Sequence, residues 1–249
     1  MELVDHVAEL LLRIILYIIF LWLDQQTPFI RHIEEEELWM YRYPLMPSIV
    51  PKWCLFFLLI FIPTVIFLAE YAVNQRYKDI VKGFYALTLV YMLSGIFTVT
   101  LKLLVGRPRP NFFLRCFPDG YGTDINHCTG EYKGHMDARK SFPSAHSTFA
   151  FSGMYFMSLR MCKLFRIKER GRFKGWKCLL ISIPVIIAVL IGVSRTCDYH
   201  HHYSDVFGGA ILGLLIAHVV YYAFYWTEGL SDEEVQKSLA NIRERLENF

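Results

Sequence analysis

The sequence lacks internal repeats, low-complexity tracts and Gly/Ser-rich linkers. Nothing therefore divides the chain, and residues 1–249 are expected to form a single domain. The chain also lacks a large net charge, because its 26 Lys and Arg residues are nearly balanced by 23 Asp and Glu residues, for a formal charge of +3. So small a charge gives no electrostatic reason to expect nucleic acid as a partner.

Hydrophobic residues, in contrast, are abundant. They make up 54% of the chain, whereas a soluble domain has roughly 45–50%, and they gather in long runs that indicate membrane-spanning helices. Six spans are expected: Val7–Leu23, Trp53–Val73, Gly83–Leu104, Ala145–Leu164, Trp176–Val193 and Val206–Trp226. The predicted fold class is therefore an all-α integral membrane protein, a six-helix transmembrane bundle.

The first run is expected to remain in the protein as a span. Its beginning carries Glu2, Asp5 and Glu9 in place of the basic region of a secretory signal, and no small-residue cleavage site follows it. Glu9 and Arg13 lie one helical turn apart, a spacing that favours an ion pair.

The order of crossings predicts the orientation of the bundle. Six spans place both termini, the 2–3 loop and the 4–5 loop on one side. Eight Lys and Arg residues lie between Arg160 and Lys177, around the 4–5 loop, against the single acid Glu169. Short cytoplasmic loops are rich in basic residues, so this side is predicted to be cytoplasmic. The other side is then lumenal or extracellular, in the endoplasmic reticulum, the endomembrane system or the plasma membrane.

Three polar clusters are predicted to meet at the non-cytoplasmic membrane surface, because each adjoins a span end on that side. The first closes the third span, the second opens the fourth span, and the third joins the last two spans. In this order their candidate functional residues are Lys102 and Arg109; Ser144, Ala145 and His146; and Ser194, Arg195, His201 and Asp205.

The third cluster pairs an imidazole with a carboxylate. His201 and Asp205 are four residues apart at the start of a helix and share a face. A carboxylate that accepts a hydrogen bond from one imidazole nitrogen fixes the tautomer and leaves the other nitrogen free to attack. Three cations, Lys102, Arg109 and Arg195, are available for the oxygens of a phosphoryl group.

The second cluster lies at a helix N-terminus, where unpaired N–H groups bind anions. Ser144 and the N–H groups of Ala145 and His146 fit this role, and the imidazole of His146 is placed to protonate a leaving oxygen. Structural alternatives stay open: Lys102 can snorkel from a span end, Arg107 and Arg109 can face lipid headgroups, and a Ser or His at a helix start can be a cap. No metal is expected at His200–His202, because adjacent residues point in different directions and no further ligand lies at a suitable spacing.

These clusters resemble the motifs of the type-2 phosphatidate phosphatases, also called lipid phosphate phosphatases. The superfamily also contains membrane glucose-6-phosphatase and the soluble vanadium haloperoxidases. Its pattern is Lys, six residues, Arg-Pro; then Pro-Ser-Gly-His; then Ser-Arg, five residues, His, three residues, Asp. The matching residues are Lys102, Arg109 and Pro110 for the first motif, and Ser194, Arg195, His201 and Asp205 for the third. The resemblance covers about residues 83–226.

The second motif departs from the family pattern, because Ala145 stands where Gly is usual. A methyl group adds little bulk and removes no donor, so activity is expected to persist with a shifted substrate preference. The stretches Arg115–Gly120 and Cys128–Gly130 look like the subgroup of phospholipid phosphatases related to diacylglycerol pyrophosphate phosphatase.

The resemblance implies a role for each matching residue. His201 is the nucleophile that forms a phosphohistidine, Asp205 orients it, and His146 is the general acid and base. Phosphate binding falls to Lys102, Arg109, Ser144, Ala145, Ser194 and Arg195. No metal and no cofactor is implied, because these cations supply the positive charge that phosphoryl transfer needs.

The implied substrates are glycerolipid phosphates in the membrane: phosphatidate, diacylglycerol pyrophosphate and lysophosphatidate. One alternative is another phosphatase of the superfamily, acting on an isoprenoid pyrophosphate, a sphingoid-base phosphate or glucose 6-phosphate. A second alternative is a non-enzymatic scaffold that binds lipid phosphates, but such a protein would be expected to have lost His201 or His146, and both are present.

Two further features leave alternatives open. Cys116 and Cys128 lie in the loop 106–143 on the non-cytoplasmic side, where they form either a disulfide or a free pair. In the tail, residues 228–249, Ser231 and Glu234 resemble a capping box. The apolar residues that follow, at spacings of four and three, predict an amphipathic helix. This helix either lies on the cytoplasmic face or on the basic 4–5 loop, or it supports a homodimer.

Overall fold

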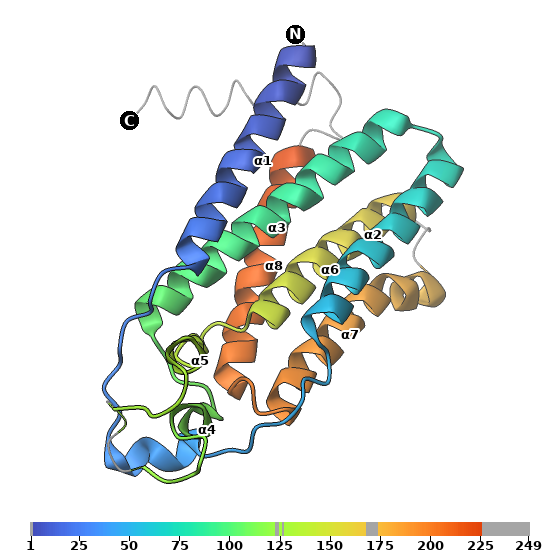
Figure 1. The fold of residues 1–249 in the computed structure, drawn as a ribbon. Coiled ribbons are helices and arrows are strands. Elements are labelled where there is room, and N and C mark those ends of the chain that lie inside the picture. Colours follow the sequence, from blue (N-terminus) through green and yellow to red (C-terminus); the bar gives the residue numbers. More distant parts are fainter. Residues whose placement is uncertain (1, 123–124, 126, 168–173, 226–249) are drawn as a thin grey trace, which may run out of the picture.

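The computed structural model describes residues 2–122, 125, 127–167 and 174–225. These residues form helices and contain no strand, which confirms the all-helical prediction (Figure 1). The six long helices are α1 (Glu2–Asp24), α2 (Lys52–Asn74), α3 (Tyr77–Val105), α6 (Ala145–Leu164), α7 (Gly175–Cys197) and α8 (Tyr203–Tyr225). Three short helices lie between them: η1 (Glu35–Tyr41), α4 (Phe112–Cys116) and α5 (Tyr132–Asp137). The predicted tail helix lies outside the described residues.

Five of the long helices are long and apolar enough to cross a membrane: Val4–Asp24 within α1, and the whole of α2, α3, α7 and α8. Helix α6 has the bounds predicted for the fourth span, but it is not among the five. Its position explains the difference. It contacts α2, α3, α7 and α8 and lies at the centre of the bundle (Figure 1), where its surface faces protein instead of lipid.

The polarity of α6 therefore reflects close packing. Ser147, Thr148 and Ser152 are fully buried on this helix, and small residues let helix backbones approach. Helix α8 contributes glycines to the same contact, because a Cβ atom built on Gly213 would lie 2.5 Å from the carbonyl oxygen of Thr148. Gly209 makes a similar contact, because a Cβ atom added there would lie 2.7 Å from the carbonyl oxygen of Ser144.

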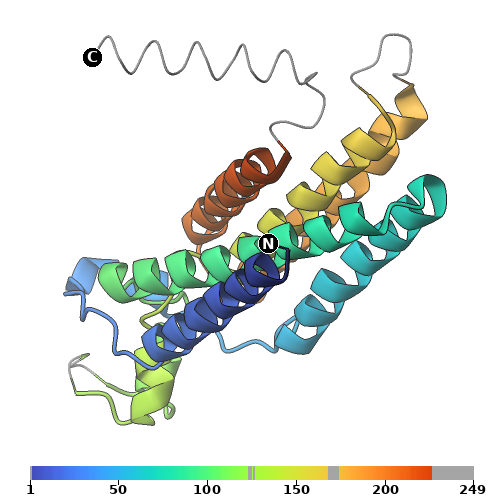
Figure 2. The same cartoon turned by 90° about the horizontal axis from the view of Figure 1, so that it is seen from above.

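Helix α1 is attached to the bundle through Arg13. Its guanidinium donates to the carbonyl oxygen of Tyr85 at 2.6 Å and to the Thr88 hydroxyl at 2.9 Å, both on α3. It also pairs with Glu9 one turn earlier, at 2.5 Å, as the sequence predicts. These contacts hold α1 along α3, as Figure 2 shows from above.

A second ion pair corrects the expected distribution of basic residues. Arg160, counted above with the basic residues of the 4–5 loop, lies inside α6 with only 2% of its surface exposed. Its guanidinium pairs with both carboxylate oxygens of Glu70 on α2, one of them 3.1 Å from Nε, and lies 4.9 Å from the centre of the Tyr225 ring. A charge this deeply buried needs such partners, so Arg160 is part of the packing of the bundle.

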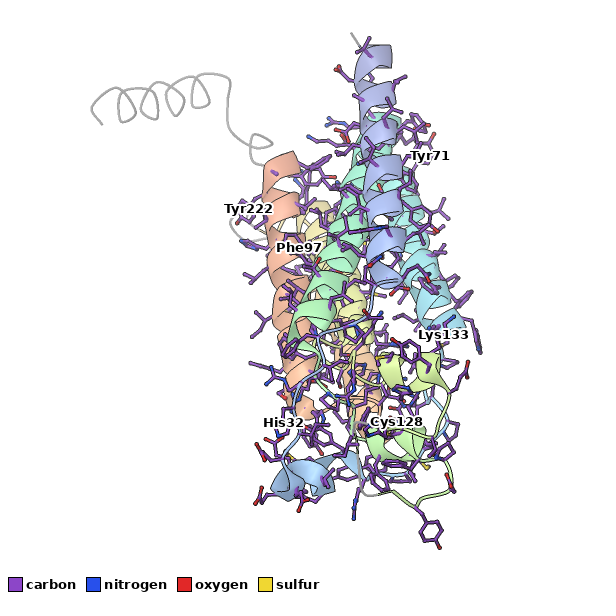
Figure 3. The ribbon with its side chains drawn as sticks, turned by 60° about the vertical axis from the view of Figure 1, so that its left-hand side comes forward. His32, Tyr71, Phe97, Cys128, Lys133 and Tyr222 are labelled. Carbon is purple, nitrogen blue, oxygen red and sulfur yellow. A yellow bond between two sulfur atoms is a disulfide. The ribbon has the colours of Figure 1, made fainter. Side chains whose placement is uncertain are left out.

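The end of the bundle far from the start of α1 and the last turn of α8 carries the long loop between α3 and α6 (Figure 1). Cys116 and Cys128 form a disulfide there, which settles the open alternative. Tyr41 of η1 packs with Phe112 and Phe113 of α4 in a buried apolar cluster. Figure 3 shows Cys128 and His32 at this end and Tyr71 at the other. The loop is thus a small packed cap over the ends of α3, α6, α7 and α8.

Candidate active site

A cavity of about 430 Å³ lies under this cap. Five predicted site residues provide side chains to its lining: Lys102, Arg109, His146, Arg195 and His201. Ala145 also lines it. One wall is apolar and is formed by Phe20 of α1, Gly95 of α3 and Phe149 of α6. The three sequence clusters therefore meet in one place.

The loop between α3 and α6 brings the first two clusters together by running back beside itself. The N–H of Arg109 donates to the carbonyl oxygen of Ala138 at 2.8 Å, and the N–H of Ser141 donates to that of Arg107 at 3.0 Å. These bonds place the residues that follow α3 next to those that precede α6.

His201 reaches the cavity because the chain folds back after α7. Tyr199 adopts a left-handed backbone conformation (φ 55°), and the N–H of His201 donates to the carbonyl oxygen of Arg195 at 3.0 Å. The imidazole is buried, with its Nδ1 atom 3.6 Å from Oδ2 of Asp205. That distance exceeds a hydrogen bond, and Nδ1 has no other partner within the described part of the chain.

Asp205 is instead held by three other donors. Its carboxylate is fully buried and accepts from Arg107 Nη1 at 2.7 Å, from the Ser141 hydroxyl at 2.5 Å and from the His202 N–H at 3.0 Å. Arg107, which the sequence left as a residue that could face headgroups, is thus the counter-ion of Asp205. Neither Arg107 nor Ser141 was predicted as a site residue.

Each of the three predicted cations already has an acceptor. Lys102 donates to the carbonyl oxygen of Lys140 at 2.5 Å, Arg109 pairs with Asp137 at 3.2 Å, and Arg195 pairs with Asp198 at 2.8 Å. The Nε atoms of Arg109 and Arg195 are nevertheless buried without a hydrogen-bond partner among the described residues. Unpaired buried donors are unfavourable, so these two side chains retain capacity for a further acceptor.

The two predicted phosphate-binding serines make contacts within their own helices. Ser144 is the N-cap of α6, and its buried hydroxyl accepts from the N–H of Ser147 at 3.4 Å. In α7 the hydroxyl of Ser194 donates to the carbonyl oxygen of Ile191 at 2.7 Å. Neither hydroxyl lines the cavity. Ala145 and His146 do line it, and their N–H groups belong to the first turn, where no intrahelical carbonyl is available.

His146 and Arg195 are both tied to the segment that precedes α2. His146 Nε2 lies 3.1 Å from the carbonyl oxygen of Val50, and Arg195 Nη1 donates to that oxygen at 3.2 Å and also to the hydroxyl of Ser48. This segment could not be predicted from the sequence, because its main contribution is the backbone carbonyl of Val50, which lies 96 residues from His146 and 145 residues from Arg195 along the chain.

Burial sets the protonation state of the buried imidazole. It lowers the pKa of His201 well below the usual value, and the charges of Arg109 and Lys102 lower it further despite the nearby carboxylate of Asp205. His201 is therefore neutral at neutral pH. A neutral imidazole among cations is suited to attack an anionic phosphoryl group. No group of three His, Cys, Asp or Glu residues that could hold a metal ion occurs within the described ranges.

Comparison with known proteins agrees with this geometry. Residues 83–228 match the model of the PAP2 superfamily. The chain is 35% identical to lipid phosphate phosphatase 2 of Arabidopsis thaliana over 225 residues, covering 88% of this chain and 77% of that protein. It is 31% identical to a probable diacylglycerol pyrophosphate phosphatase of Schizosaccharomyces pombe, covering 78% and 72%. A putative phosphatidate phosphatase of Drosophila melanogaster is also 31% identical, covering 72% and 57%. No solved structure matches significantly.

Proposed function

Because the chain belongs to the PAP2 superfamily, we propose that it is a metal-independent phosphatase that hydrolyses phosphate monoesters or pyrophosphates of glycerolipids. The substrate class follows from relatives named as lipid phosphate and diacylglycerol pyrophosphate phosphatases. The observation that carries the proposal is the neutral His201 imidazole, which shares a cavity with two guanidinium groups whose Nε–H donors have no acceptor among the described residues.

In the first chemical step His201 attacks phosphorus through Nε2, because Asp205 lies on the Nδ1 side. A bond forms between Nε2 and phosphorus while the bond from phosphorus to the lipid oxygen breaks, and the electron pair stays on that oxygen. His146 takes up a proton when the anionic phosphate binds beside it, and gives that proton to the departing alcohol. The imidazole becomes positively charged, and a shorter contact from Nδ1 to Asp205 then stabilises the phosphohistidine.

In the second step His146, now neutral, takes a proton from water as the water attacks phosphorus. The bond from phosphorus to Nε2 breaks and inorganic phosphate leaves. Lys102, Arg109 and Arg195, with the N–H groups of Ala145 and His146, hold the phosphoryl oxygens in both steps. Ser144 and Ser194 support these groups from behind, through the cap of α6 and the last turns of α7.

The first test is activity in a chelator. Phosphate release from phosphatidate in neutral detergent micelles is expected to be the same with EDTA as with added Mg²⁺, because cationic side chains supply the charge that a metal ion otherwise provides. The measurement is inorganic phosphate released by the purified chain. Loss of activity in EDTA that Mg²⁺ restores would contradict the proposal.

The proposal includes a single membrane domain with six spans, α6 being the central one, and with the core motifs in about residues 83–226. The active site would face the lumen or the exterior and both termini the cytoplasm. The Cys116–Cys128 disulfide supports this orientation, because disulfides persist in oxidising compartments. We also propose that residues 228–249 form a cytoplasmic tail that supports a homodimer. These residues lie outside the described part of the chain.

The orientation can be tested with two native thiols. Cys197 ends α7 beside the cavity, Cys178 lies near the other end of α7, and both are exposed. In sealed right-side-out vesicles, a membrane-impermeant maleimide is expected to label Cys197 in a Cys178→Ser chain and not Cys178 in a Cys197→Ser chain. The reverse pattern would invert the proposed topology.

A further inference from the structure

The cavity holds more positive charge than one phosphoryl group requires. Its lining contains six Lys and Arg side chains but only two carboxylates. The cations are Lys52, Lys102, Arg109, Arg115, Lys140 and Arg195, and the acids are Asp24 and Asp137. The mechanism above uses three of the cations. The remaining three come from other elements, namely the start of α2, the short helix α4 and the loop before α6.

Arg115 is only partly satisfied among these remaining cations. Its Nε atom donates to Asn111 at 3.3 Å, while its two terminal nitrogens make no hydrogen bond within the described part of the chain. Burial lowers the pKa of Arg115, and the like charge of Arg109 lowers it further. Two guanidinium groups on the lining of one cavity are an arrangement that favours a bound anion.

Asp137 marks the place where such an anion fits. Its side chain is 54% exposed and pairs with Arg109. Burial opposes ionisation of Asp137, yet neighbouring positive charges hold the pKa of its carboxyl below the usual value. In decreasing order of influence these charges are Arg109, Lys102, Arg115 and Lys52. Asp137 is thus a half-exposed carboxylate that lines the same cavity as all four of these cations.

We propose that Arg115 and Lys52 form an outer subsite that binds the second phosphate of a lipid pyrophosphate, next to the inner site where the terminal phosphate is transferred. The inference rests on the proposed function and adds the residues that distinguish a pyrophosphate from a monophosphate. In the free protein Asp137 pairs with Arg109, and it gives up this contact when the substrate enters.

The two substrate classes differ in what leaves phosphorus. With a monophosphate the leaving group is an alcohol oxygen, which needs a proton from His146. With a pyrophosphate, Nε2 of His201 bonds to the terminal phosphorus, and the bond from that phosphorus to the bridging oxygen breaks. The electron pair stays on the bridging oxygen, and the lipid monophosphate leaves as an anion. Such a leaving group needs positive charge more than a proton, and Arg115 and Lys52 supply it.

The test compares kcat/KM for diacylglycerol pyrophosphate and phosphatidate with the same acyl chains, in neutral detergent micelles, because kcat/KM reports formation of the phosphoenzyme. Arg115→Gln is expected to lower kcat/KM for the pyrophosphate roughly 10- to 100-fold, as loss of a charge-assisted hydrogen bond does, with little change for phosphatidate. Arg115→Lys should recover part of the loss. The matched control is Lys133→Gln, at the same end of the molecule but outside the cavity (Figure 3).

A complementary variant makes the test sharper. His146→Ala should lower kcat/KM for phosphatidate more than for the pyrophosphate, the opposite order to Arg115→Gln. An equal loss on both substrates in Arg115→Gln would overturn the outer subsite and leave the proposed function intact. A loss that appears only when anionic lipid is added to the micelles would also overturn it, by assigning Arg115 to neighbouring headgroups. If Arg115→Gln does not fold, Lys52→Gln decides between the same outcomes. Failure of the wild-type chain on both substrates would refute the proposed function itself.

Discussion

A chain with His201 replaced by Asn is expected to release phosphate from phosphatidate at least roughly 10³-fold more slowly than the wild type, because removal of a nucleophile abolishes the covalent route. Asn is close to His in size and polarity, so the turn between α7 and α8 should keep its shape. The measurement is kcat in detergent micelles containing EDTA, with the melting temperature of each protein taken alongside.

His202→Asn is the matched control. The His202 side chain bonds the carbonyl oxygen of Pro108 at 3.2 Å and does not line the cavity, so less than a tenfold effect is expected, about that of one hydrogen bond. The wild-type pH profile adds a second check. Attack needs the neutral imidazole, and burial lowers the pKa of His201. The imidazole therefore stays neutral as pH falls through the ordinary His range, and its protonation should limit kcat/KM only below that range. Full activity of the Asn variant would exclude His201 as the nucleophile.

The second large effect is expected at the buried pair of Glu70 and Arg160. Glu70→Leu leaves the Arg160 guanidinium in the bundle without a carboxylate, since the ring of Tyr225 and the carbonyl oxygen of Asp79 at 3.4 Å are weak substitutes. Breaking a buried pair in this way destabilises a protein by roughly 3–5 kcal/mol. The measurement is thermal or denaturant unfolding in a detergent that keeps the wild-type chain folded.

The double variant Glu70→Leu/Arg160→Met is the decisive control. Because it removes both charges and keeps apolar volume, it should regain most of the stability that the single variant loses. Glu34→Ala, which removes an exposed carboxylate next to His32, should have little effect. If the double variant is no more stable than Glu70→Leu, the loss of stability comes from the change in side-chain shape and not from the broken ion pair.

The sequence predicted the elements of the site better than the contacts between them. The order of membrane crossings predicted that Lys102, His146 and His201 lie at the same end of the bundle, and the structure places all three on the lining of one cavity. The partners of Asp205 could not be derived in this way. Arg107 reaches Asp205 across 98 residues of chain, and the main sign of it in the sequence is that a buried carboxylate needs a cation.

Hydropathy likewise described the outside of the bundle better than its centre. Hydropathy measures how apolar a helix is, so it identifies α2 and α7, whose outer faces carry exposed apolar side chains. Helix α6 touches protein on all sides, and its Ser and Thr residues lower the hydropathy without exposing polar groups. The same reasoning applies to Arg160. A count of basic residues assigns it to a loop, but it lies in the interior because it pairs with the buried carboxylate of Glu70.

The apolar wall that α1 gives the cavity has a consequence for how such enzymes diversify. Phe20 packs against Gly95, where an added Cβ atom would lie 3.0 Å from its ring, yet α1 and α2 precede the segment that matches the superfamily. The shared segment carries the phosphate chemistry, whereas part of the wall comes from outside it. Substitutions in α1 can therefore reshape this wall during evolution, while the reacting groups stay as they are.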